Sequence, residues 1–114
     1  MTTYRTPAEQ KAAEVYADAL AALRTARVPA DAQDTGGGSM VLYCPLEGAR
    51  YLMISDVGDP LASRRSAQEG WGVGLYLVDG EPDDPVSYRC TYDTSVDGLM
   101  EVVQDSLMKR PDQW

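Results

Sequence analysis

Apolar residues near the N-terminus recur at the spacing of an α-helix. Before them stands Thr6-Pro7-Ala8-Glu9. The threonine can cap a first turn, proline suits the first helical position, and Glu9 completes a capping box. We therefore predict one helix over residues 7–26, ended by Val28-Pro29. Its apolar stripe comprises Ala12, Val15, Tyr16, Ala19, Leu20 and Leu23.

A second helical stripe lies near the C-terminus. Thr94 is placed to cap it, with Asp97 reaching back, and Pro111 to stop it. Lys109 and Arg110 suit the negative end of the helix dipole. Its apolar residues are Val96, Leu99, Met100, Val103 and Leu107.

Four strand-like segments lie between these stripes, near residues 40–44, 50–56, 71–79 and 86–92. The last alternates cleanly, and we expect Val86, Tyr88, Cys90 and Tyr92 to form its buried face and Ser87, Arg89 and Thr91 its wet face. Residues 30–39, ADAQDTGGGS, are expected to be a flexible linker, because three successive glycines are costly to order.

The resulting order is α-β-β-β-β-α in a single domain, residues 1–114. No helix separates the strands, so they should form antiparallel hairpins. The prediction is an α+β fold, in which a four-stranded, mainly antiparallel sheet carries two helices packed on one face.

Three glycines, Gly70, Gly72 and Gly74, stand at alternate positions, just before and within the 71–79 segment. A glycine signature for phosphate binding would be followed by a helix, whereas these lead into a strand. In a strand they share one face, opposite Trp71 and its apolar neighbours. We expect a helix of the protein itself to pack on this bare face, with a partner's surface as the alternative.

The formal net charge is −8, which argues against nucleic acid as a direct ligand. It is compatible with solubility alone, and also with a basic protein partner met by electrostatic steering. The predicted contact surface combines an acidic turn with carboxylates spaced by four on the last helix. A solvated helix face is the alternative. These acids are Asp79, Glu81, Asp83, Asp84, Asp97, Glu101 and Asp105.

The chain has no histidine, which removes Ser–His and Cys–His nucleophile pairs. Cys44 and Cys90 are expected to be free and buried, and two cysteines without histidine do not make a usual zinc site. We predict no catalytic residue, no metal and no cofactor. A carboxylate pair, Asp56 and Asp59, remains an enzymatic alternative.

The segment 57–70 is long for a connector, and long loops often carry function. It can accommodate a short helix within Leu61–Glu69. Arg64 and Arg65 are predicted as partner-binding anchors, because arginine is favoured at interface hot spots. Ordinary solvent exposure is the alternative. With Asp56 and Asp59 they could instead form a site for a small ligand.

The strand 86–92, the following amphipathic helix and the closing Arg110-Pro111-Asp112-Gln113-Trp114 resemble immunity proteins of bacterial polymorphic-toxin systems, of the type paired with deaminase toxins. Met108-Lys109 stand where that family has a glycine before Arg-Pro. The resemblance implies a non-enzymatic inhibitor that blocks one cognate toxin.

The sequence therefore predicts an acidic, non-enzymatic protein that neutralises a basic protein partner, as an immunity protein or a related inhibitor from a mobile element. A homodimer formed through the sheet is the structural alternative, and a small-ligand binder or enzyme using residues 56–70 is the third. The polar N-terminus and the lack of a long apolar run favour a cytoplasmic protein without a membrane span.

Overall fold

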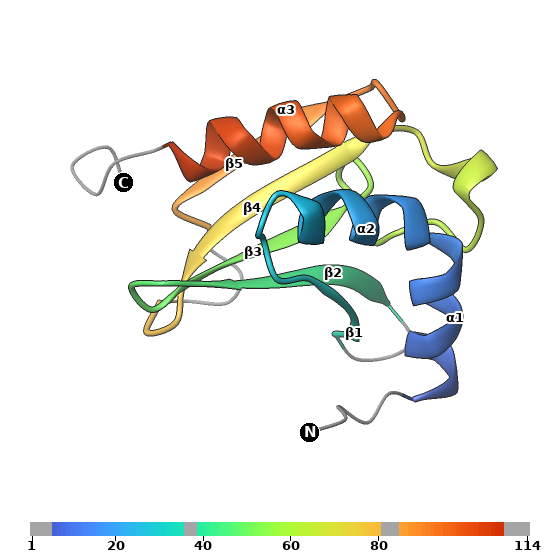
Figure 1. Cartoon of the computed structure of the whole chain (residues 1–114), viewed down its shortest axis with the longest axis horizontal. Helices are drawn as coiled ribbons and strands as arrows, with labels where there is room; N and C mark the ends of the chain where they lie inside the picture. Colours follow the sequence, from blue (N-terminus) through green and yellow to red (C-terminus); the bar gives the residue numbers. More distant parts are fainter. Residues whose placement is uncertain (1–5, 36–38, 81–84, 109–114) are drawn as a thin grey trace.

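A computed structural model describes residues 6–35, 39–80 and 85–108. Within them the chain is an α+β fold, as predicted (Figure 1). The elements are α1 (Pro7–Val15), α2 (Ala17–Thr25), β1 (Asp31–Asp34), β2 (Met40–Leu46), β3 (Arg50–Ser55), the 3-10 helix η1 (Arg65–Ala67), β4 (Trp71–Leu77), β5 (Ser87–Thr91) and α3 (Val96–Leu107).

The strands form one antiparallel sheet in the order β1-β2-β3-β4-β5, so each strand pairs with its neighbour in the chain. The α-helices lie on one side of this sheet (Figure 1). The antiparallel sheet and the one-sided helix layer agree with the prediction. The described residues hold five strands and three α-helices, so the predicted four strands and two helices are corrected.

The extra strand, β1, falls in the segment predicted to be a flexible linker. Asp31–Asp34 pairs with β2, with Ala32 opposite Leu42. The linker prediction is wrong here because Ala30 and Ala32 are buried and supply a small apolar face. A hydrogen bond of 2.9 Å from the Thr35 N–H to the Ser39 carbonyl oxygen closes the connection to β2. Gly36–Gly38 lie outside the described residues.

The extra helix arises because the predicted helix 7–26 is interrupted at Tyr16, whose φ and ψ are −106° and 27°. The predicted capping box is present, since Thr6 Oγ1 accepts from the Glu9 N–H at 3.1 Å and Glu9 Oε1 accepts from the Thr6 N–H at 2.9 Å. The break lets α1 contact β1 while α2 contacts α3. Helical periodicity continues across it, so the pattern gave no sign of the bend.

The core lies between the helices and the sheet. Leu52, Ile54 and Leu75 of the sheet are fully buried there, as are Leu23 of α2 and Leu99 of α3. Met100 and Leu107, both predicted for the apolar stripe of the last helix, are only partly buried. None of the described helices is both long enough and apolar enough to cross a bilayer.

The predicted buried face of β5 is wrong. Tyr88 is 45% exposed, Tyr92 just after the strand is 72% exposed, and Cys90 is exposed. Tyr88 lies opposite Gly74, while Arg89 lies opposite the buried Val73 on the side of the helices. Alternation separates two faces but does not show which one a helix covers.

The cap of α3 is one residue beyond its predicted place. Ser95, not Thr94, is the N-cap, and its Oγ accepts a hydrogen bond from the Gly98 N–H at 3.1 Å. Asp93 Oδ1 in turn accepts from the Ser95 N–H at 3.0 Å. Hydrogen bonds from the side chain of Ser95 and from its N–H lower the pKa of the exposed Asp93 carboxyl. The Arg110–Trp114 segment that carries the family resemblance lies outside the described residues.

Candidate functional site

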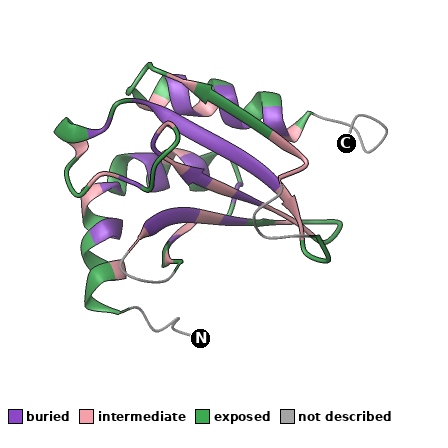
Figure 2. Ribbon diagram, turned by 180° about the vertical axis from the view of Figure 1, so that it is seen from behind, coloured by how far each residue is buried: buried purple, intermediate pink, exposed green. Residues whose placement is uncertain are grey.

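No described helix or strand packs on the side of the sheet away from the α-helices, and Figure 2 views the molecule from this side. Its side chains alternate along each strand with those that enter the core. Tyr51 pairs with Tyr76, Met53 with Gly74, and Gly74 with Tyr88 across three adjacent strands. We call this surface the tyrosine face. It comprises Tyr43, Tyr51, Met53, Tyr76 and Tyr88, and the buried Val41 belongs to the same side.

Three of these rings form a row across β2, β3 and β4. The ring centroids of Tyr43 and Tyr51 lie 5.3 Å apart, and those of Tyr51 and Tyr76 lie 5.2 Å apart with nearly parallel planes at 10°. Such cross-strand aromatic contacts stabilise a sheet and fix the ring positions. All three rings are only partly buried, so they remain accessible from solvent.

Two of the alternate glycines lie beneath these tyrosines. A Cβ built at Gly72 would collide with the hydroxyl of Tyr88, and one at Gly74 would come within 2.7 Å of the Tyr76 ring. The expectation that a helix packs on the glycine face is therefore wrong. The protein's own tyrosines lie there instead, and the glycines provide the space that they need.

A shallow groove of about 490 Å³ runs beside these rings. Gly74 and Met53 belong to its sheet side, and the turn after β3 contributes Gly58, Asp59 and Pro60. The N–H of Gly58 donates to Tyr88 Oη at 3.1 Å, which joins the turn to β5. The lining residues are Val41, Met53, Ser55, Gly58, Asp59, Pro60, Gly74, Tyr76 and Tyr88.

The acids predicted to bind a partner lie elsewhere. Asp97, Glu101 and Asp105 are exposed on α3, and we call them the acidic stripe. Asp79 is exposed just after β4, whose end lies at the same end of the sheet as the C-terminal end of α3 (Figure 1). The stripe belongs to the helix layer, so these carboxylates and the tyrosine face do not form one continuous surface. Glu81, Asp83 and Asp84 lie outside the described residues.

Arg65, a predicted anchor, is engaged within the fold. Its guanidinium carbon lies 4.9 Å from the ring centroid of Trp71, and Nη2 donates to Asp18 Oδ2 at 3.0 Å and to the Thr94 carbonyl at 3.1 Å. Burial acts to raise the pKa of Asp18, but hydrogen bonds from Arg65 and the Ala19 N–H outweigh it and lower that pKa. These contacts join η1 to α2 and to the start of α3.

Arg64, the other predicted anchor, is exposed, so only this member of the pair presents its side chain freely among the described residues. The two neighbouring arginines therefore differ in role. Arg65 fastens the loop, and Arg64 is open to solvent.

Asp56, the buried member of the carboxylate pair, also fastens the loop 57–70. Asp56 is 6% exposed, and its carboxylate accepts hydrogen bonds from the N–H groups of Val57 at 2.7 Å and Gly70 at 3.0 Å, and from that of Glu69. Asp59 pairs with Asp56 through the backbone but is itself exposed. The two carboxylates thus have different surroundings, one enclosed by backbone donors and one in water.

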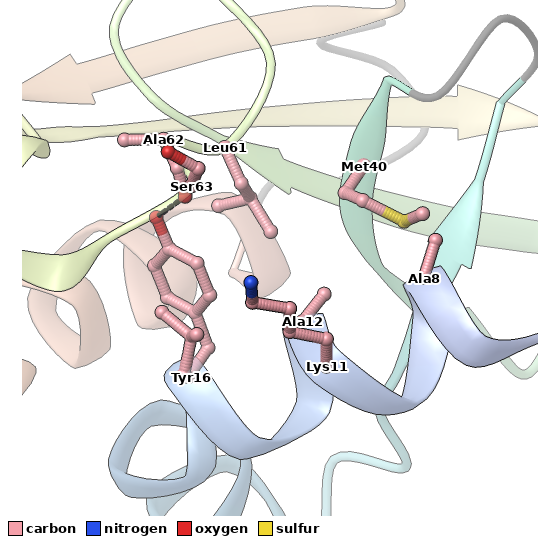
Figure 3. Close-up of a pocket in the computed structure, with 9 residues that line it drawn as sticks. Ala8, Lys11, Ala12, Tyr16, Met40, Leu61, Ala62 and Ser63 are labelled. Carbon is pink, nitrogen blue, oxygen red and sulfur yellow. Dashed lines mark hydrogen bonds between the residues drawn. The ribbon is translucent and has the colours of Figure 1, made fainter.

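A second, smaller cavity of about 200 Å³ lies between α1 and the 61–63 segment (Figure 3). Its lining is largely apolar, with Ala12, Met40 and Leu61, and Lys11 is its charged residue. The Tyr16 hydroxyl lies 2.6 Å from the Ala62 carbonyl oxygen and 2.7 Å from Gln68 Oε1. That hydroxyl is therefore held by the loop.

The two cysteines are free, as predicted, but differ in exposure. Cys44 is buried, and burial raises the pKa of its thiol to about 12. Cys90 is exposed, so its predicted burial is wrong. Across the described ranges, no three Cys, Asp or Glu side chains cluster to hold a metal ion.

Comparison with protein-family models, with curated proteins and with solved structures gave no match to this chain.

The tyrosine face is the candidate surface that sequence reasoning missed. A signal was present, because Tyr51, Met53 and Ser55 alternate with the aliphatic Leu52 and Ile54. Assigning the purely aliphatic set to the core leaves the tyrosines on the other side. In β4 the glycines interrupt the same pattern, and in β5 the more apolar face is the exposed one.

Proposed function

We propose that this chain is an acidic, non-enzymatic protein that binds and neutralises a basic protein partner, as an immunity protein does. The observation that supports the proposal is the tyrosine face, an accessible aromatic surface on a chain of net charge −8. Tyrosine is enriched at protein interfaces and at their hot spots.

Charge and aromatic contacts have separate parts in this proposal. A net negative charge accelerates encounter with a basic protein, and the effect weakens as salt screens it. Close contact with tyrosines acts mainly on the rate of dissociation. The acidic stripe attracts the basic partner at long range. It also forms a second contact if the bound partner extends to the helix layer.

The test begins with capture of partners from the native cell by the full chain, followed by purification of each captured protein. Tyr51→Ser with Tyr76→Ser forms one variant, and Asp97→Lys with Glu101→Lys and Asp105→Lys forms the other. We expect the tyrosine variant to dissociate from the partner at least tenfold faster than wild type does. The charge variant should associate more slowly than wild type at low salt and at the same rate as wild type at high salt.

The partner's own activity supplies the decisive measurement. A basic partner should lose its activity when mixed with the wild-type chain and keep it when mixed with the tyrosine variant. The proposal is wrong if captured proteins are acidic, if their activity is unaffected, or if neither variant changes binding. Circular dichroism of each variant checks that the fold is retained.

The same surface favours one other candidate, a homodimer formed through the sheet, because two tyrosine faces could cover each other. A net charge of −8 on each copy opposes that association at low salt. Sedimentation equilibrium at low and high salt distinguishes a homodimer from a monomer that binds a basic partner. A dimer that strengthens with salt and disappears in the tyrosine variant supports the homodimer.

A further inference from the structure

We propose that the groove beside Tyr76 and Tyr88 receives an arginine side chain of the basic partner. The inference rests on the proposed function and adds the chemical group that the surface recognises. Its evidence is the combination of aromatic rings, a carboxylate and an apolar base in one hollow, contributed by Tyr76, Tyr88, Asp59 and Met53.

The lining favours a cation. The rings of Tyr76 and Tyr88 carry negative potential on their faces, and cations bind there. Asp59 is an exposed acidic residue that lines the same groove. No lysine or arginine is among the described lining residues, and Arg89 lies opposite Val73, on the other side of the sheet. The local charge is therefore complementary to a basic group, as is the charge of the whole chain.

Arginine fits this lining better than lysine. A guanidinium is planar and weakly hydrated, stacks on aromatic rings and pairs with a carboxylate through two parallel hydrogen bonds. Its aliphatic stem can lie along apolar surface, which Val41 and Met53 provide. An ammonium is more strongly hydrated and makes no planar stack.

The groove is formed before any ligand arrives. The Gly58 N–H holds Tyr88 Oη at 3.1 Å, and Tyr51 stacks on Tyr76 at 5.2 Å. Gly72 and Gly74 leave the space in which these rings lie. Because the rings are already held, little side-chain freedom is lost when a cation binds.

The experiment titrates the full chain, with ¹³C-labelled tyrosine and methionine, with N-acetyl-arginine amide. The matched neutral probe is N-acetyl-citrulline amide, which has nearly the same shape without the charge. We expect saturable NMR shifts of Tyr76, Tyr88 and Met53 with arginine, and at least fivefold weaker binding of citrulline. An equal response to both probes, or no saturable shift at these residues, overturns the inference.

Two variants separate a specific site from general attraction to an acidic protein. Asp59→Asn should weaken arginine binding about fivefold, whereas Glu14→Gln on α1, which removes the same charge at an exposed position outside the groove, should leave it unchanged. Equal loss in both variants contradicts the groove as the site. If arginine binds as expected but no basic partner is inhibited, the proposed function fails and the groove stands. If wild type and Asp59→Asn inhibit a basic partner equally, the inference about the groove is wrong, whereas the proposed function is retained.

Discussion

Single glycines determine how closely the tyrosines approach the sheet. At Gly72 a Cβ would collide with Tyr88 Oη and would lie 2.9 Å from the backbone oxygen of Asp56. The hydroxyl could rotate away, but the backbone oxygen could not without moving the turn after β3. The sequence predicted correctly that these glycines share one face. It could not show what lies over them, because that depends on the rotamers of Tyr76 in the same strand and of Tyr88 in β5.

We predict that Gly72→Ala lowers the free energy of unfolding by about 1–3 kcal/mol, because the added methyl overpacks this contact. Urea denaturation gives the value. Gly80→Ala is the matched control, since its Cβ would lie 3.4 Å from Leu77, an ordinary contact, and it should change stability by less than about 0.5 kcal/mol. Equal effects at the two positions would show that the methyl at Gly72 finds room.

At the scale of elements, the loop 57–70 is fastened at several points that the sequence did not reveal. Asp56 accepts from backbone N–H groups at both ends of the loop, and Arg65 joins η1 to α2 and α3. The length of the loop suggested function. Its buried polar contacts show that much of it has a structural part, and its contribution to the groove comes from Gly58, Asp59 and Pro60.

We predict that Arg65→Met lowers the free energy of unfolding by about 1–2 kcal/mol at neutral pH, because charge-assisted hydrogen bonds and a ring contact are lost. Hydrogen exchange of the backbone N–H groups in residues 57–70 should become faster. Arg64 is the exposed neighbour, and Arg64→Met should change neither the stability nor the rate of hydrogen exchange. Equal effects of the two substitutions would contradict the role of Arg65 in holding the loop.

The effect of Arg65→Met should also depend on pH. The pKa of Asp18 is lowered in the fold, so the stabilisation is present above the usual aspartate pKa and is lost as pH falls through the lowered value. The difference in stability between wild type and Arg65→Met should therefore shrink below about pH 4. A constant difference would mean that Asp18 is not the partner that matters.

The elements themselves were predictable to different degrees. The capping box at Thr6 placed the start of α1 correctly, and the apolar centre of the 50–56 segment placed β3, because both signals are local. The bend at Tyr16 and the strand β1 were missed, because each depends on a contact with a distant segment. Tyr16 meets Ala62 and Gln68, and Ala32 pairs with Leu42.

At the scale of the molecule, charge and aromatic surface lie on different sides. The acidic stripe lies on α3, which belongs to the helix layer (Figure 1). The tyrosine face lies on the opposite side of the sheet, because its residues alternate along the strands with those of the core. Composition predicted the charge but not its position relative to the tyrosines, because that follows from which face the helices cover. Long-range attraction needs no contact, so the two surfaces can serve one encounter.

The buried core makes the folded chain sensitive to alkali. Burial is the main cause that raises the pKa of Tyr16 and of Cys44 to about 12, from ordinary values of 10.0 and 9.0. Above those ordinary values the unfolded chain releases protons that the folded chain retains. The stability that comes from keeping these groups protonated is therefore complete below about pH 9 and is lost as pH rises toward 12.

We predict that wild type loses about 1 kcal/mol more stability per pH unit between pH 9.5 and 11 than Cys44→Ala does. Urea midpoints across this range give the slopes. Cys90→Ala removes a thiol that is exposed in the fold and should keep the wild-type slope. If the stabilities of Cys44→Ala and wild type fall with the same slope, water reaches the thiol in the folded chain. Cys44 would then not be buried between the helices and the sheet.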